Sequence, residues 1–96
     1  MMRGFKLSPA AISDIAAIWD YTAEHWSADQ ADRYTDDIRD ACEALCSGLK
    51  VGRPVDVRPG YMKYAVGSHM LYFRQMDDWI VIVRILHQRM DVGTRL

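Results

Sequence analysis

The first half of the chain contains two segments in which apolar residues recur at helical spacing. Ser8 and Pro9 can begin the first helix, because serine is a favoured N-cap and proline fits the first helical position. Residues with this spacing predict one apolar stripe, formed by Ile12, Ile15, Ala16, Trp19, Ala23 and Trp26. Ile18, Tyr21 and His25 lie off the stripe, where they either pack on a neighbouring element or offer a second apolar face to a partner.

The second helical segment begins after Ser27. Ser27 and Gln30 have the spacing of a capping box, and Gly48 is a suitable stop. The predicted apolar stripe consists of Ala31, Tyr34, Ile38, Ala41, Cys42, Leu45 and Leu49. The opposite face is charged and is expected to face solvent. The two helices are expected to form a hairpin.

Strand patterns flank this hairpin. Residues 4–7 form a short strand candidate, and residues 50–60, rich in glycine and proline, form an irregular connection. Three further strands are predicted at 61–66, 69–76 and 79–86, joined by the two-residue links Gly67-Ser68 and Asp77-Asp78. The chain is therefore expected to be one α+β domain spanning residues 1–96: an N-terminal strand, a two-helix hairpin and a three-stranded antiparallel meander, with the helices on one face.

Composition adds a packed core and no membrane segment. Half of the 96 residues are hydrophobic, yet no apolar run approaches the roughly 18 residues of a membrane span or resembles a signal peptide. A cytoplasmic protein is expected. Cys42 and Cys46 lie four residues apart without nearby histidines, which favours a reduced, packed pair over a disulfide or a zinc site.

Charge is unevenly distributed along the chain. The formal net charge is −1, but residues 1–49 hold four basic and nine acidic groups, whereas residues 50–96 hold eight basic and four acidic ones. This asymmetry indicates either an anionic partner for the second half or ordinary solvated charge.

The sequence lacks the motifs of a serine triad, a phosphate loop, a zinc site or a glycine-rich nucleotide fingerprint. What remains is a cluster of cations and aromatic residues: Tyr61, Lys63, His69, Tyr72, Arg74, Arg84, His87 and Arg89. Such a cluster suits a surface that meets phosphate or an acidic protein. Arg84 interrupts an apolar strand, so it either pairs with a carboxylate or marks a site.

Several of these segments also carry a family resemblance. They are Ser8-Pro9-Ala10-Ala11, Ile18-Trp19-Asp20-Tyr21, Gly60-Tyr61, the run from Gly67 to Arg74, and Val83-Arg84-Ile85-Leu86-His87-Gln88. In this order, over nearly the whole chain, they resemble the ParE toxins of bacterial toxin–antitoxin operons.

The resemblance implies the fold shared by ParE and RelE proteins, a ParD-like antitoxin as partner and DNA gyrase as target, with no cofactor and no metal. Operator DNA would be bound only through the antitoxin. An antitoxin segment is expected in a groove between the helical hairpin and the sheet, near Ile18, Tyr21 and His25. The expected target contacts are Tyr61, Lys63, Tyr72, Arg74, Arg84, His87, Arg89 and Arg95.

The related RelE ribonucleases, which cut messenger RNA on the ribosome, supply the alternative function. Lys63 and Arg89 fall at basic positions of that pattern, and His87 is a candidate acid or base together with His69. Ala65 and Met70 stand where the pattern has a lysine and an arginine, and its terminal tyrosine has no counterpart near Arg95. Each charge-stabilising donor typically contributes about 2.7 to 4 kcal/mol, so the missing donors should slow cleavage by orders of magnitude. Binding is therefore predicted rather than catalysis.

Overall fold

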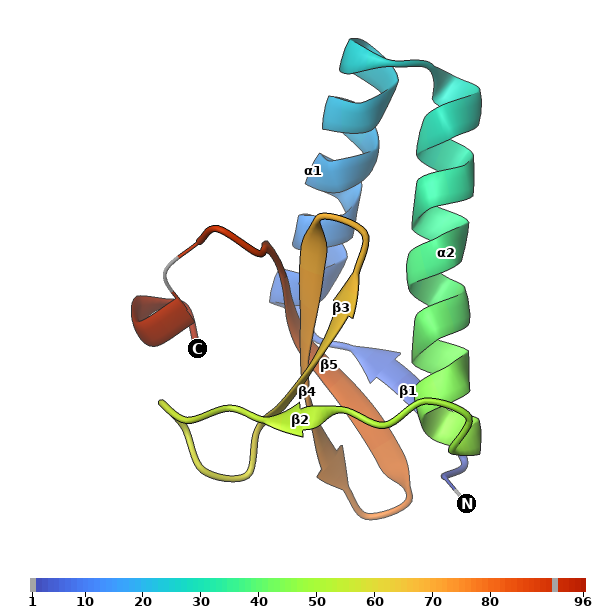
Figure 1. The fold of residues 1–96 in the computed structure, drawn as a ribbon. Helices are drawn as coiled ribbons and strands as arrows, with labels where there is room; N and C mark the ends of the chain where they lie inside the picture. Colours follow the sequence, from blue (N-terminus) through green and yellow to red (C-terminus); the bar gives the residue numbers. More distant parts are fainter. Residues whose placement is uncertain (1, 91) are drawn as a thin grey trace.

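A two-helix hairpin packs on one face of a five-stranded sheet in the computed structural model, which describes residues 2–90 and 92–96 (Figure 1). The elements are β1 (Gly4–Leu7), α1 (Pro9–His25), α2 (Ala28–Ser47), β2 (Arg53–Pro54), β3 (Met62–Val66), β4 (His69–Met76), β5 (Trp79–His87) and a 3₁₀ turn η1 (Val92–Thr94). The sheet order is β1-β5-β4-β3-β2; β1 is parallel to β5, and the other pairs are antiparallel. The predicted α+β architecture is confirmed.

The short strand β2 was not predicted. Arg53 pairs with Lys63 and Pro54 with Met62, which adds a fifth strand at the edge of the sheet. Proline cannot donate to a ladder and is tolerated at a sheet edge, so glycine and proline in this segment obscured a strand of only two residues.

The predicted helix boundaries follow from their caps. The Oγ atoms of Ser8 and Ser27 accept hydrogen bonds from the backbone N–H groups of Ala11 and Gln30, each at 3.0 Å. Gly48 ends α2 in the left-handed conformation with φ 83°. These groups satisfy backbone atoms that a helix end would leave without partners.

Apolar clusters lie on both faces of the sheet. The larger one joins the helices to the sheet and includes Ile38, Leu71 and Ile82. The smaller one lies on the face away from the helices, hereafter the open face, and consists of Val55, Met70, Tyr72 and Leu86. Val92 and Leu96 of the C-terminal tail pack against it, so the tail covers part of the open face.

The predicted stripe of α1 is confirmed only in part: Ile15 packs against the core, but the ends of the stripe do not. Ala11 and Ile18 are the buried residues of this helix, whereas Ile12 is 54% exposed and Trp26 77% exposed. Ile18 therefore belongs to the core beneath α1. The inward face also carries Asp14, whose polar side chain breaks the apolar periodicity from which the stripe was read.

The stripe of α2 is confirmed except at its end. Ala31, Ile38, Cys42 and Leu45 are buried, while Leu49 lies beyond the helix and is 81% exposed. Both cysteines are free thiols, and burial raises the pKa of Cys42 to about 12. Neither helix of the described chain is long and apolar enough to cross a membrane.

Candidate functional site

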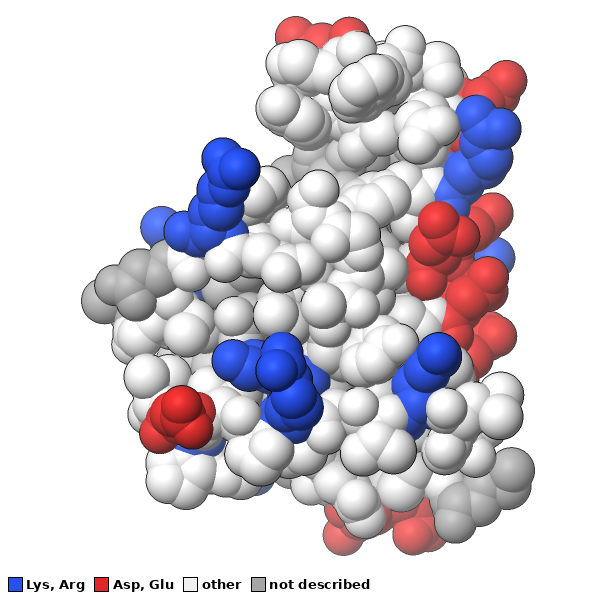
Figure 2. Space-filling view, in the orientation of Figure 1, with Lys and Arg blue, Asp and Glu red and all other residues white. Residues whose placement is uncertain are grey.

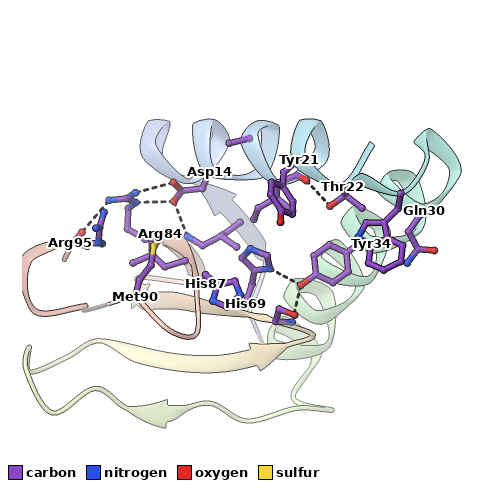
Figure 3. A pocket seen from close by; sticks show the side chains of 16 residues that line it. Asp14, Tyr21, Thr22, Gln30, Tyr34, His69, Arg84, His87, Met90 and Arg95 are labelled. Carbon is purple, nitrogen blue, oxygen red and sulfur yellow. Dashed lines mark hydrogen bonds and ion pairs between the residues drawn. The ribbon is translucent and has the colours of Figure 1, made fainter. Parts of the chain in front are cut away.

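A groove of about 600 Å³ separates α1 from the ends of β4 and β5 (Figure 3). Ile18, Ile85 and Leu86 supply apolar lining, and most of the lining surface is apolar. Tyr21 and Trp26, 61% and 77% exposed, line it from the far half of α1. The groove thus combines a buried apolar base with exposed aromatic rings.

An ion pair closes the groove at one end. Arg84 donates from Nε and Nη2 to the Asp14 carboxylate at 2.8 and 2.9 Å, and the backbone N–H of Ile85 donates to Asp14 Oδ2 at 2.9 Å. The hydrogen bond to Asp14 raises the pKa of Arg84. Arg84 Nη1 also donates to the carbonyl of Arg95 at 3.3 Å, tying the tail to the strand. The prediction of a structural carboxylate partner for Arg84 is confirmed.

The position of Asp14 follows from the length of β1. This strand pairs with β5 only as far as Ile82, so beyond it β5 has no strand neighbour on that side. The Ser8 hydroxyl donates to the carbonyl of Val83 at 2.6 Å, and Asp14 accepts from Ile85. Two side chains from the start of α1 thereby replace the missing strand.

Tyr34 joins α2 to the β3–β4 hairpin at the other end of the groove. Its hydroxyl lies 2.6 Å from Nδ1 of His69 and accepts a hydrogen bond from the N–H of Ser68 at 3.0 Å. Gly67 at the hairpin tip has φ 55°, and a Cβ atom there would lie 2.6 Å from the Tyr34 ring. Only glycine allows this close approach. Burial raises the pKa of Tyr34 and lowers that of His69, which the nearby His87 lowers further.

His69 and His87 are register partners on β4 and β5, with ring centroids 5.5 Å apart and edge-to-face geometry. Both line the groove. His87 Nδ1 accepts from the N–H of Arg89 at 3.1 Å, and Tyr34 holds His69. The structure therefore gives both histidines hydrogen-bonding partners within the fold.

The residues expected to meet an antitoxin differ in their placement. Ile18 and Tyr21 line the groove, Ile18 as part of its buried base. His25 stacks on Tyr21 with a centroid distance of 3.9 Å, and its Nδ1 lies 2.9 Å from the Tyr21 carbonyl. His25 thus supports the ring of Tyr21 rather than lining the groove itself.

The residues expected to meet the target fall into separate regions. Arg84, His87 and Arg95 line the groove. Lys63 and Arg74 are register partners of Tyr72 and Val81 on the open face, where Arg74 lies near Tyr61. Arg89 is an exposed residue of the tail.

Tyr72 requires a correction. It is 6% exposed and belongs to the cluster beneath Val92 and Leu96, so its ring is not presented to a partner. The tail that covers Tyr72 has no periodicity from which this burial could have been predicted.

The three residues suggested for a ribonuclease do not converge. Lys63 lies on the open face, whereas His87 faces the groove on the helix side of the sheet, and Arg89 is in the tail. Among residues 2–90 and 92–96 no three metal-binding side chains come together either. The groove residues that the sequence did not identify include Asp14, Tyr34 and Trp26. The charge of Arg84 in an apolar strand indicated a carboxylate partner but not which residue supplies it.

Comparison with known proteins places this geometry in a family. Residues 5–92 match the family model described as the ParE toxin of the type II toxin–antitoxin system parDE. The chain belongs to the ParE toxin family.

Two curated relatives cover essentially the whole chain. Toxin ParE1 of Mycobacterium tuberculosis is 40% identical over 98 residues, covering 100% of both chains. Toxin ParE1 of Caulobacter vibrioides is 31% identical over 96 residues, covering 99% of both.

Solved structures support the fold. A chain of the chromosomal ParDE toxin–antitoxin system from Pseudomonas aeruginosa superposes with a TM-score of 0.78 at 24% identity, covering 90% of this chain and 96% of that one. A chain of the RelBE2 toxin–antitoxin complex from Mycobacterium tuberculosis gives 0.59 at 18% identity, covering 92% and 100%. This chain thus shares its fold with a chain of each system, and fold alone does not separate their functions.

Proposed function

We propose that this protein is the toxin of a type II toxin–antitoxin pair, that it inhibits DNA gyrase in the cytoplasm by protein contact, and that a ParD-like antitoxin neutralises it. The observation that carries the proposal is the groove between α1 and the sheet in a chain of the ParE family. Sequence-specific operator binding is assigned to the antitoxin.

The groove suits an amphipathic segment of a partner chain. Its apolar base would receive aliphatic side chains, while Tyr21 and Trp26 supply large exposed rings of the kind that dominate interface energies. Two relatives in the structural comparison belong to toxin–antitoxin systems named as ParDE and RelBE2, which supports an antitoxin as the occupant.

Contact with gyrase is favoured over cleavage of messenger RNA by the arrangement of the side chains. A ribonuclease must bring an acid, a base and charge-stabilising donors to one phosphate. Lys63 and His87, two of the candidates, lie on opposite faces of the sheet.

The test compares two activities of the purified protein. We expect it to inhibit supercoiling by gyrase and to leave messenger RNA intact on translating ribosomes. Mapped cuts in the messenger with normal supercoiling would replace the proposal by the ribonuclease alternative.

The antitoxin site is tested by a matched pair of variants. Tyr21→Ala and Trp26→Ala remove exposed rings from the groove, so each is expected to weaken binding of the antitoxin encoded beside this toxin by about tenfold or more. Ile12→Ala removes a side chain that is 54% exposed on α1 but absent from the groove lining, and it is expected to leave the affinity unchanged. Calorimetric titration with the antitoxin measures both, and equal losses would place the antitoxin elsewhere.

A further inference from the structure

The open face carries a band of cations from one edge of the sheet to the other. On β1, Lys6 points away from the core that its neighbours Phe5 and Leu7 contact. Lys63 on β3 is the register partner of Arg53 on β2, and paired residues share a face. The band also includes cations that lie over two aromatic rings. In full it consists of Arg3, Lys6, Arg53, Arg58, Lys63 and Arg74.

Two rings each hold two of these cations. Arg58 and Arg74 lie 4.8 and 5.4 Å from the centroid of Tyr61. At the β1 edge, Arg3 and Lys6 lie 5.7 and 4.3 Å from the ring of Trp79. The aromatic faces attract each cation, but they also bring like charges close together.

Within the described chain, no carboxylate forms an ion pair with a residue of this band. The ion pairs found there are Arg39–Asp36 on α2 and Arg84–Asp14 in the groove, and neither includes a residue of the band. Figure 2 shows basic groups over the strands on the side in view; most acidic groups lie along α2, where basic groups also lie, and others lie at the lower left and at the bottom. Alternating charges would stabilise an ordinary solvated sheet better than this arrangement does.

The guanidinium groups of the band keep donors for an external anion. A guanidinium that lies over a ring still presents its N–H groups at its edge, in the fork geometry that matches a phosphate. A single contact joins Arg74 Nη1 to the Tyr61 hydroxyl, at a long 3.4 Å. An anion that bridges these groups would also relieve the repulsion between them.

We propose that the open face binds the phosphate backbone of DNA without reading its sequence. Neighbouring strands are about 4.8 Å apart, so the band from β1 to β2 spans about 19 Å. A nucleic-acid backbone offers anions repeatedly over such a width, whereas the carboxylates of a folded protein would have to match each cation separately. The inference deepens the proposed function, because gyrase would present DNA beside the bound toxin, although the phosphate contact itself needs no gyrase.

Fluorescence anisotropy with a labelled 20-base-pair duplex, which is longer than the band is wide, tests the inference directly. We expect the intact protein to bind the duplex at about 50 mM salt and to lose affinity steeply toward about 200 mM. The double variant Lys63→Gln with Arg74→Gln should lower the slope of log affinity against log salt by about 1.8, or about 0.9 for each lost phosphate contact. Its affinity at low salt should fall by about tenfold or more.

The control is Arg33→Gln with Arg39→Gln on α2, which changes the net charge equally but leaves the open face intact. Circular dichroism checks each fold, and Arg53→Gln with Arg58→Gln replaces the first variant if that one unfolds. Equal losses in the α2 control, unchanged binding by both open-face variants, or no binding by the intact protein would overturn the inference. Binding to single-stranded RNA but not to the duplex would overturn the DNA assignment.

The gyrase assay keeps this inference separate from the proposed function. If the intact protein inhibits supercoiling but does not bind DNA, the phosphate site is overturned and gyrase remains the proposed target. If the open-face variants then also lose this inhibition, the open face is assigned to contact with an acidic protein surface. If the intact protein binds DNA but does not inhibit supercoiling, gyrase is overturned as the target and the phosphate site is kept.

Discussion

The groove and the open face both carry arginines, but the surroundings of these arginines differ. In the groove, Arg84 is held by the carboxylate of Asp14 and by the carbonyl of Arg95. On the open face, Arg58 and Arg74 share the ring of Tyr61 without a carboxylate in ion-pair contact among the described residues. The comparison shows that the most conspicuous charge in the sequence, inside an apolar strand, is structural, whereas less conspicuous ones remain available to a partner.

The largest expected change in stability comes from emptying the covered part of the open face, compared with removing an exposed ring from the groove. Tyr72→Ala should lower the free energy of unfolding by about 4 kcal/mol, because it empties a site that is 6% exposed. Tyr21→Ala removes a ring that is 61% exposed and should change stability by about 0.5 kcal/mol or less. Urea denaturation measures both, and similar values would mean that the tail does not cover Tyr72 in solution.

Removing the carboxylate from the groove comes next. Asp14→Ala should cost about 3 kcal/mol, because it leaves Arg84 and the N–H of Ile85 without their partner in a partly buried site. Asp36→Ala breaks an exposed pair with Arg39 and should cost about 0.5 kcal/mol. Equal costs in urea denaturation would contradict a structural role for the groove pair.

The contact between the hairpin and α2 can be broken by one methyl group. Gly60 and Gly67 both have positive φ, so an alanine at either position should cost about 1 kcal/mol in backbone strain. Nothing lies within 4 Å of a Cβ at Gly60, whereas one at Gly67 would meet Tyr34 at 2.6 Å. Gly67→Ala should therefore cost about 1 to 2 kcal/mol more than Gly60→Ala, and equal thermal unfolding of the two variants would argue against the tight contact.

The smallest effect concerns pH. Burial lowers the pKa of His69 below its ordinary 6.5, with His87 opposing its protonation and Asp14 favouring it. The folded state therefore resists a proton that the unfolded chain accepts, and stability should fall as the pH drops from about 6.5 toward the lowered pKa. His69→Gln should flatten the dependence of unfolding free energy on pH. An unchanged slope in His69→Gln would assign the dependence to other groups.

Much of the fold could be predicted because its signals are local. The serine caps, the glycine stop of α2 and the two-residue hairpin links each act within a few neighbouring residues. The buried face of α1 could be predicted only in part, because Asp14 lies on it and accepts a hydrogen bond at the edge of β5. That requirement depends on residues about 70 positions away. A prediction from apolar periodicity assumes that every carboxylate faces solvent, and this assumption fails for Asp14.

The site was predictable only in outline. Tyr21 was identified as a residue off the expected stripe, and the need of Arg84 for a carboxylate followed from its position in an apolar strand. The pairing of Tyr34 with His69 joins α2 to β4, and neither residue has a local feature that indicates the other. The separation of Arg84, which Asp14 holds, from the cations of the open face also required the tertiary contacts of α1 and the register of the strands.

Asp14 also has a consequence for behaviour at high concentration. A strand with unpaired N–H and carbonyl groups along one side is a template for intermolecular sheet growth. By accepting from Ile85 beyond the end of β1, Asp14 occupies a backbone N–H group that a second chain would need for pairing. The same carboxylate that orders the groove is therefore also a built-in protection against aggregation.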